Sequence, residues 1–129
     1  MFVTNELLEQ IEDKAKLSPK LRANFCLHKL STDSVQKMVN VLLPGTVMPI
    51  HRHLYTDELI VLIRGKITII FFDNEGHETN RFILSSHDGI GINIPLGQWH
   101  NVLVEEPAAV FEIKTGPYRP LDDDKEIWR

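Results

Sequence analysis

The sequence predicts an all-β domain, a sandwich or a barrel, preceded by one short N-terminal helix. Short runs rich in Ile, Val and Phe recur at close spacing from residue 24 onward, as is typical of β-strands. Gly, Pro, Asn and Asp separate these runs and favour turns. Strand counting alone does not separate a jelly roll from an immunoglobulin-like sandwich.

The helix is predicted over residues 4–16, because four apolar residues recur there at helical spacing. They are Leu7, Leu8, Ile11 and Ala15. Thr4 is the expected N-cap, since its hydroxyl can accept a hydrogen bond from a free backbone N–H. Pro19 limits the helix, because the residue before a proline avoids helical angles. We expect this helix to pack on the outside of the β-core.

Nine strands are predicted in the rest of the chain. They are residues 24–29, 35–43, 47–53, 58–64, 66–72, 78–84, 90–94, 99–104 and 108–115. Gly65 is expected to form a tight hairpin between two of them, and residues 73–76 a second hairpin turn. Residues 121–129 are acidic and are expected to lie on the surface.

Length and composition predict a single domain. The 129 residues fit one domain by size, with 1–24 as a helical segment, 25–120 as the barrel and 121–129 as a tail. The formal net charge of −4 disfavours nucleic-acid binding, which needs a basic face. A lone cysteine, Cys26, fits a reducing compartment, and neither a secretory signal nor a membrane-spanning run is visible. We therefore expect a cytoplasmic protein without nucleic-acid or membrane partners.

Two stretches carry residues that can bind a metal. The first, Gly45 to Gly65, contains His51 and His53, one residue apart, and Glu58. Alternate residues of a strand point to the same face, so an H-x-H pair aims two imidazoles at one point. The second, Gly89 to His100, supplies a third histidine just after a P-x-G turn.

Imidazole nitrogens and a carboxylate oxygen suit Fe, Mn, Ni, Zn or Cu, and the sequence does not choose among these divalent ions. Four protein ligands leave two positions of an octahedral ion open for a substrate, whereas a tetrahedral zinc would be closed and structural. The alternative is that these residues are scattered strand histidines and a surface glutamate.

The spacing of these residues resembles the two cupin motifs. Gly45, His51, His53, Glu58 and Gly65 occupy every position of the first motif. The second motif is filled by Gly89, Pro95, Gly97 and His100, but Val104 stands where the motif has an asparagine. The flanking stretches, Arg22 to His28 and Phe111 to Pro120, resemble the WbuC-type cupin metalloproteins.

This resemblance implies a single cupin domain, a jelly-roll-type double-stranded β-barrel that holds one divalent transition metal through His51, His53, Glu58 and His100. WbuC-type proteins are associated with surface-polysaccharide gene clusters. The resemblance therefore implies a sugar or sugar-nucleotide context without naming a reaction.

Five further residues are candidates for the site, each with a simpler alternative. His28 is a candidate acid–base residue or a hydrogen-bonded histidine, and Lys114 is a candidate catalytic residue or a solvated strand lysine. Arg22 and Asn24 can bind a carboxylate or sugar hydroxyls if they line the pocket. Tyr118 is a candidate pocket residue or a packing residue at a turn.

Two functions follow from these observations. The first is a metalloenzyme acting on a small polar molecule, and the alternative is a non-catalytic metal- or small-ligand-binding cupin. Polar residues beside the metal would favour the enzyme, and a purely apolar pocket the binder. The predicted strands 58–64 and 66–72 are apolar on both faces, so we also expect a homodimer that covers the outer face.

Overall fold

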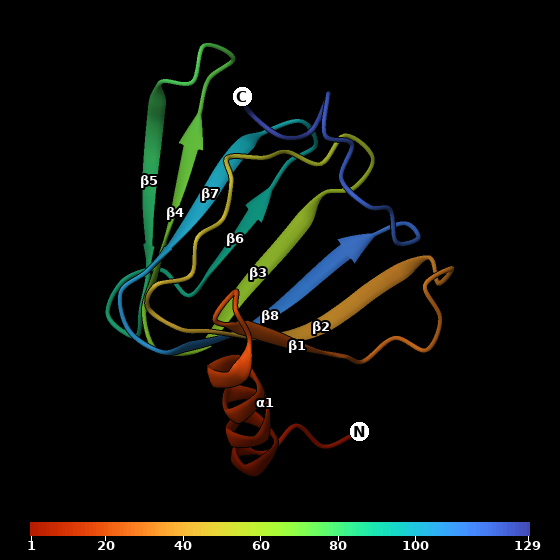
Figure 1. The fold of residues 1–129 in the computed structure, drawn as a ribbon, viewed down its shortest axis with the longest axis vertical. Coiled ribbons are helices and arrows are strands. Elements are labelled where there is room, and N and C mark those ends of the chain that lie inside the picture. The colour runs from red at the N-terminus through yellow and green to blue at the C-terminus, as the bar shows by residue number, and fades with distance from the viewer.

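A computed structural model describes all residues from Met1 to Arg129 and contains one helix and eight strands. The elements are α1 (Asn5–Leu17), β1 (Arg22–Cys26), β2 (Val35–Leu42), β3 (Glu58–Arg64), β4 (Ile67–Phe72), β5 (Glu78–Leu84), β6 (Gly91–Ile94), β7 (Trp99–Val104) and β8 (Ala108–Thr115). The expected all-β class with a short N-terminal helix is confirmed (Figure 1).

Two antiparallel sheets face each other and enclose the main core. The larger sheet has the order β1-β2-β8-β3-β6 and the smaller one β5-β4-β7. Residues of both sheets pack together between them, for example Ile60 and Val110 from the larger sheet and Ile69 from the smaller one. This arrangement is a jelly-roll β-fold, which the strand pattern alone did not separate from an immunoglobulin-like sandwich.

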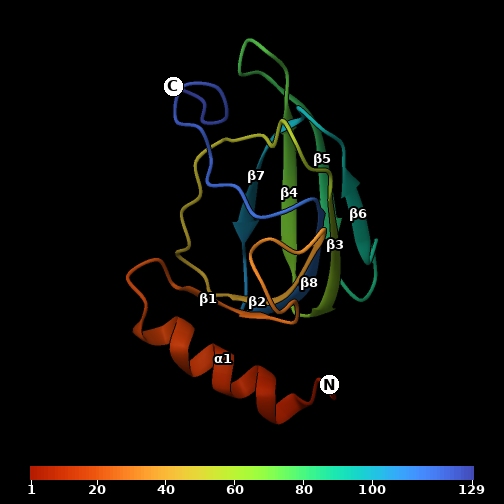
Figure 2. The ribbon, with the colours of Figure 1, turned by 90° about the vertical axis from the view of Figure 1, so that its right-hand side faces the viewer.

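Helix α1 lies outside the two sheets, as expected, and covers part of the larger one (Figure 2). Thr4 is the N-cap and its Oγ1 accepts the N–H of Leu7 at 3.1 Å. Leu8, Ile11 and Ala15 are buried against the outer side of β2 and β8 in a second core. The helix therefore covers apolar surface that would otherwise face water.

The expected hairpin at Gly65 is wrong, because β3 and β4 belong to different sheets. Gly65 instead lies where the chain passes from one sheet to the other. Its φ is +87°, and a Cβ there would lie 2.2 Å from the carbonyl oxygen of Pro107. Only glycine fits both the left-handed backbone and this close approach. The second expected turn is confirmed, since β4 and β5 pair across residues 73–76.

The expected strand over residues 47–53 is also wrong, since this segment forms only an isolated bridge at His51. His51 exchanges two backbone hydrogen bonds with His100 of β7, of 3.0 and 2.8 Å. On its other side the segment is bonded to the C-terminal tail, where Trp128 N–H donates to the Ile50 carbonyl. The segment thus continues the smaller sheet beyond β7 without regular strand geometry.

Candidate metal centre and its cavity

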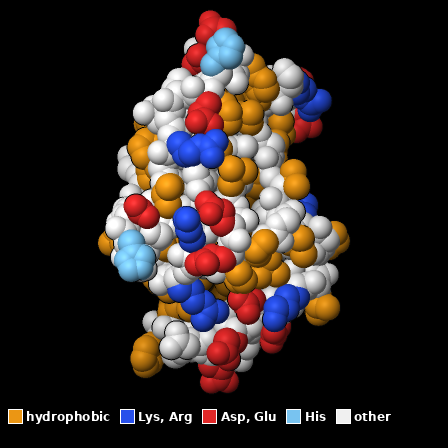
Figure 3. Space-filling model, turned by 90° about the vertical axis from the view of Figure 1, so that its left-hand side faces the viewer, with side chains coloured by type: hydrophobic (Ala, Val, Ile, Leu, Met, Phe, Trp, Pro, Cys, Tyr) orange, Lys and Arg blue, Asp and Glu red, His pale blue; other side chains and the backbone are white.

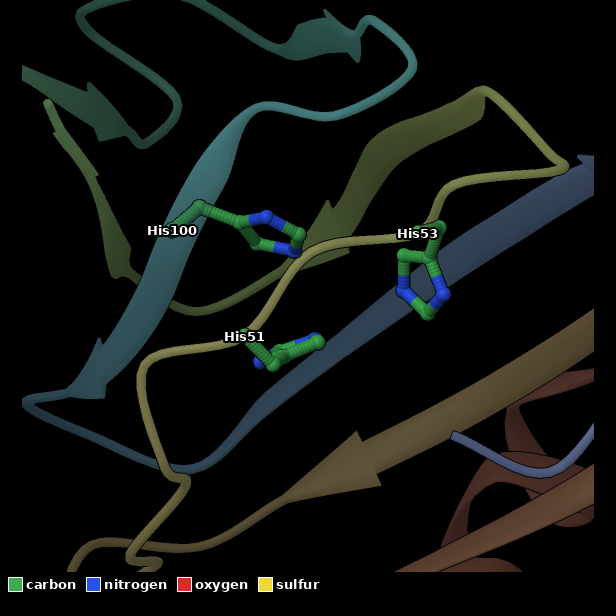
Figure 4. Close-up of side chains that lie close together, drawn as sticks. All are labelled: His51, His53 and His100. Atoms are coloured by element: carbon green, nitrogen blue, oxygen red, sulfur yellow. The ribbon is translucent and has the colours of Figure 1, made fainter. Parts of the chain in front are cut away.

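Three histidines gather on the inner side of the smaller sheet, in a wall of the main cavity. His51 and His53 come from the irregular segment and His100 from β7 (Figure 4). One nitrogen of each ring can be chosen so that all three lie within 4.8 Å of one another. Their ring centroids are 4.3 to 5.8 Å apart. The structure therefore brings together the three histidines that the two sequence motifs suggested.

Glu58, the fourth expected ligand, is the first residue of β3 and lies beside the histidines. Its Oε2 is 3.3 Å from His53 Nε2, and its Oε1 is 3.9 Å from His100 Nε2. Both His53 Nε2 and Glu58 Oε2 are buried without a hydrogen-bond partner. A buried polar atom without a partner costs free energy. A cation bound between these donors would satisfy both atoms, so the residues present fit a metal ion.

Backbone carbonyls fix the orientation of two rings. His51 Nδ1 lies 2.9 Å from the Pro49 carbonyl oxygen, and His100 Nδ1 lies 2.9 Å from that of Gln98. A carbonyl only accepts, so each Nδ1 must carry the proton and donate it. In the neutral ring, the free lone pair is then on Nε2, the nitrogen through which such histidines bind a metal.

The ionisation of these groups also suits metal binding. Burial, together with the neighbouring His100, lowers the pKa of His51 to about 4. Burial likewise lowers the pKa of His100. Burial by itself would raise the pKa of Glu58, but the adjacent His53 imidazole and the Lys114 charge hold it below its usual range. Near neutral pH, both of these imidazoles are therefore unprotonated and the carboxylate is charged.

A second polar group adjoins Glu58. Lys114 Nζ lies 3.4 Å from Glu58 Oε2 and 3.5 Å from Glu112 Oε1, and Asn40 Nδ2 donates to Glu112 Oε2. Burial, followed by the charge of Glu58, raises the pKa of Glu112 to about 8. Burial alone would lower the pKa of Lys114, but the charges of Glu112 and Glu58 raise it. Lys114 is therefore a paired, half-buried lysine, not a solvated one.

The cavity that contains these groups has a volume of about 660 Å³, within the range of small-ligand sites. Arg22, Asn24, Lys114 and Tyr118, four of the five further candidates, line it. The fifth, His28, lines a smaller neighbouring cavity of about 310 Å³, where its Nδ1 accepts the Lys37 N–H at 3.1 Å. The structure therefore places His28 apart from the three histidines.

The C-terminal tail holds the segment that carries His51 and His53. Most of the tail is exposed, but Glu126 is buried. Its carboxylate accepts the N–H of Leu54 at 3.0 Å and that of Asp122 at 2.9 Å, and its carbonyl accepts the N–H of Arg52. Further along, Trp128 packs edge-on against Trp99, with ring centroids 5.3 Å apart. The tail thus acts as a strap across the ligand segment.

Several residues of this site were not among the candidate site residues predicted from the sequence. Glu112 could have been inferred from the sequence, because it lies two residues before Lys114 on β8 and therefore points to the same face of the strand. Tyr55 and Arg119 line the cavity from irregular segments, where no periodicity predicts direction. Glu126 lies in a charged tail, and nothing in its local sequence indicates burial.

A second group of metal-binding residue types lies at the β4–β5 turn. It consists of Asp73, Glu75 and His77. Glu75 and His77 are exposed, and Asp73 is already bonded to the N–H groups of these two residues. Exposed acidic turns of this kind are common without a bound ion.

Two facing antiparallel sheets of jelly-roll topology with a histidine cluster inside define the cupin fold. Solved structures that share this fold, at 20% sequence identity, support the assignment of the fold. The family model described as "Domain of unknown function (DUF6016)" matches residues 3–84, well over half of the chain, and the chain belongs to this family. No curated protein matches the sequence.

Three solved structures illustrate the shared fold. The capsular polysaccharide assembling protein CapF from Staphylococcus aureus has a TM-score of 0.67 and 20% identity, covering 86% of this chain and 32% of CapF. The Bacillus subtilis oxalate decarboxylase, described with Mn(II) centres, has a TM-score of 0.60 and 20% identity, covering 77% and 26%. The protein TT1209 from Thermus thermophilus has a TM-score of 0.64 and 19% identity, covering 90% and 98%.

The chain therefore spans about a third of CapF and about a quarter of the decarboxylase, and the likeness to them is one of fold. No helix in the structure has both the length and the apolar character needed to cross a membrane.

Proposed function

We propose that this chain binds one divalent transition-metal ion through His51, His53, His100 and Glu58. The convergence of three imidazoles, with ligand atoms within 4.8 Å of one another, carries the proposal. The unpartnered His53 Nε2 and Glu58 Oε2 support it independently. Fe, Mn, Ni, Zn and Cu all suit this donor set.

We further propose that the chain is a metal-dependent enzyme of the WbuC type that acts on a small polar molecule in a surface-polysaccharide context. A bound ion would supply Lewis-acid or redox chemistry at its open positions. The protein's own part is to bind and orient the substrate in the cavity. Lys114, Glu112 and Asn40 can exchange hydrogen bonds with it beside the metal ligands.

Polar groups beside the ligands favour an enzyme over a passive metal-binding protein. Lys114 and Glu112 are held together near Glu58, and gathering such groups costs free energy of desolvation. The sugar context comes from the resemblance to WbuC-type proteins. CapF, which shares the fold, is a capsular polysaccharide assembling protein. Homodimerisation and a cytoplasmic location remain parts of this proposal.

Metal analysis of single-histidine variants tests the site. Protein purified without added metal should contain about one transition-metal ion per chain. His53→Ala should lose most of it. His77→Ala is the matched control, because it removes a histidine from the exposed turn cluster and should keep the metal. Metal lost from His77→Ala and kept by His53→Ala would move the site to the turn and refute the proposal.

Turnover tests the enzymatic part. Metal-loaded protein is incubated with a panel of sugar nucleotides and small carboxylates, and conversion is followed by mass spectrometry. We expect conversion of at least one compound and its loss in Lys114→Met at unchanged metal content. Compounds that displace metal-bound water but are never converted would favour a non-catalytic binding protein.

A further inference from the structure

The cavity mouth carries positive charge although the chain as a whole is acidic. Lys20, Arg22 and Arg119 all line the cavity, and Lys20 and Arg119 are exposed. None of these three mouth cations forms an ion pair, whereas Lys114, deeper in the cavity, is paired with two carboxylates. Three cations without an ion pair thus line one cavity in a chain with a net charge of −4.

The carboxylates that line the cavity do not neutralise this mouth. They are Glu58, Glu112 and Glu126. Glu58 and Glu112 share Lys114, and Glu126 accepts two backbone N–H groups. These carboxyl groups are therefore largely buried and already have partners, whereas the three cations have no carboxylate partner. Charge of one sign around a concave opening attracts ligands of the opposite sign.

Two exposed tyrosines accompany the mouth cations. Tyr55 is 59% exposed and Tyr118 is 57% exposed, and both line the cavity. The Arg119 guanidinium lies 4.4 Å from the centroid of the Tyr55 ring. This cation–π contact restricts the arginine side chain in the free protein. Less conformational entropy is then lost when its N–H groups bind an oxyanion.

An amide beside the mouth has hydrogen-bonding capacity to spare. Asn24 lies on β1 and lines the cavity. The bond its Nδ2 makes is to Met38 Sδ at 3.7 Å, and a thioether is a weak acceptor. A ligand hydroxyl would be a stronger partner for this amide.

We propose that the cavity takes a small hydroxylated oxyanion, whose carboxylate or phosphate is held at the mouth by Arg22 and Arg119. Asn24 then bonds a hydroxyl of the same molecule, and Lys20 adds attraction at longer range. The assignment deepens the proposed function, on which it rests for the idea that the other end of the ligand reaches the histidines. It names an anionic substrate class and assigns roles to Arg119, Lys20 and Tyr55.

Three hexose probes of similar size and different charge test this proposal. Binding of glucuronate, glucose 6-phosphate and neutral glucose to the metal-loaded protein is measured by calorimetry. The two anions separate a carboxylate from a phosphate ligand, and glucose reports what remains without charge. The Arg22→Gln/Arg119→Gln variant removes the two arginines of the mouth. Lys14→Gln/Lys37→Gln is the control, because it changes the net charge equally at two exposed lysines outside the cavity.

At least one anion should bind about tenfold more tightly than glucose, since charge-assisted bonds are roughly twice as strong as neutral ones. The arginine variant should remove that advantage, and the lysine control should keep it. Glucose binding as tightly as both anions, equal losses in the two variants, or no binding of either anion would each overturn the proposal.

Metal content, measured on every sample, keeps this test separate from that of the proposed function. Anions that fail to bind a metal-loaded protein refute the mouth site alone. Anions that bind as expected to a protein unable to hold metal refute the metal centre and leave the mouth site standing.

Discussion

Replacing Glu126 by alanine is expected to loosen the segment that carries His51 and His53. The Glu126 side chain is 5% exposed, and its two oxygens accept the N–H groups of Leu54 and Asp122 at 3.0 and 2.9 Å. Alanine leaves both donors without this partner. Bonds to a charged acceptor contribute about 1.5–3 kcal/mol each. Because water can reach part of the vacated site, we expect a loss of roughly 2–4 kcal/mol in the free energy of unfolding.

Thermal and denaturant unfolding of the metal-free protein measure this loss. For a chain of this size the change corresponds to a fall in Tm of roughly 7–15 °C. Asp124→Ala is the matched control, because it removes an exposed carboxylate from the same tail and should change Tm little. Glu126→Gln should fall in between, since the amide keeps one acceptor oxygen. Nickel affinity should also fall about tenfold in Glu126→Ala, because supporting contacts of this kind orient metal ligands.

A Tm of Glu126→Ala equal to that of wild type would refute the idea that the tail holds the ligand segment. Equal losses in Glu126→Ala and Asp124→Ala would show that tail charge, and not the buried contact, is responsible.

Gly65→Ala should unfold far more easily than Gly97→Ala in denaturant, because both have positive φ but only Gly65 has a backbone atom 2.2 Å from the added Cβ; equal losses would contradict the steric argument. The pKa of His51 is lowered to about 4, so its contribution to stability is present above the unfolded-state pKa of about 6.5 and is lost as pH falls from there towards 4. In the metal-free protein, wild type should therefore lose free energy of unfolding relative to His51→Gln as the pH falls over that range. A difference between the two that does not depend on pH would refute the lowered pKa of His51. Light scattering at tens of micromolar should give twice the chain mass of 14.8 kDa, and Leu103→Asp should reduce it, since Leu103 is 41% exposed on the outer side of β7; a monomeric wild type would refute the dimer.

The homodimer was predicted because the strands carry more apolar residues than a single buried face of a sheet needs. The structure accounts for part of that excess, since α1 covers Ile63 of β3 on the outside. Ile83 and Leu103 remain 40% and 41% exposed on the outer side of the smaller sheet. Figure 3, which shows the molecule from the side of β5, displays hydrophobic side chains lying among charged ones.

Local sequence determined most of the element boundaries. β5, β7 and β8 begin and end where alternation and turn residues predict them, because strand propensity and turn chemistry act over a few residues. The helix is confirmed with its expected N-cap, since capping involves only neighbouring residues. The proximity of His51, His53 and His100 followed from motif spacing combined with a family resemblance, not from local propensity.

Partners distant in sequence decided the remaining features. Gly65 looks like a hairpin residue, but its neighbours β3 and β4 pair with strands of different sheets. The residue types of a turn do not show which strands pair with each other. Residues 47–53 have the composition of a strand, yet the hydrogen bonds of His51 go to His100 and those of Arg52 go to the tail.

By itself, the sequence determined a β-domain with an outer helix and the histidines that meet in it. Tertiary structure decided that the acidic tail holds the ligand segment through the buried Glu126 and that Arg22 and Arg119 line one cavity. Both features join residues more than 70 positions apart. Burial and charge arise there from the folded surroundings of each residue, which local propensity does not encode.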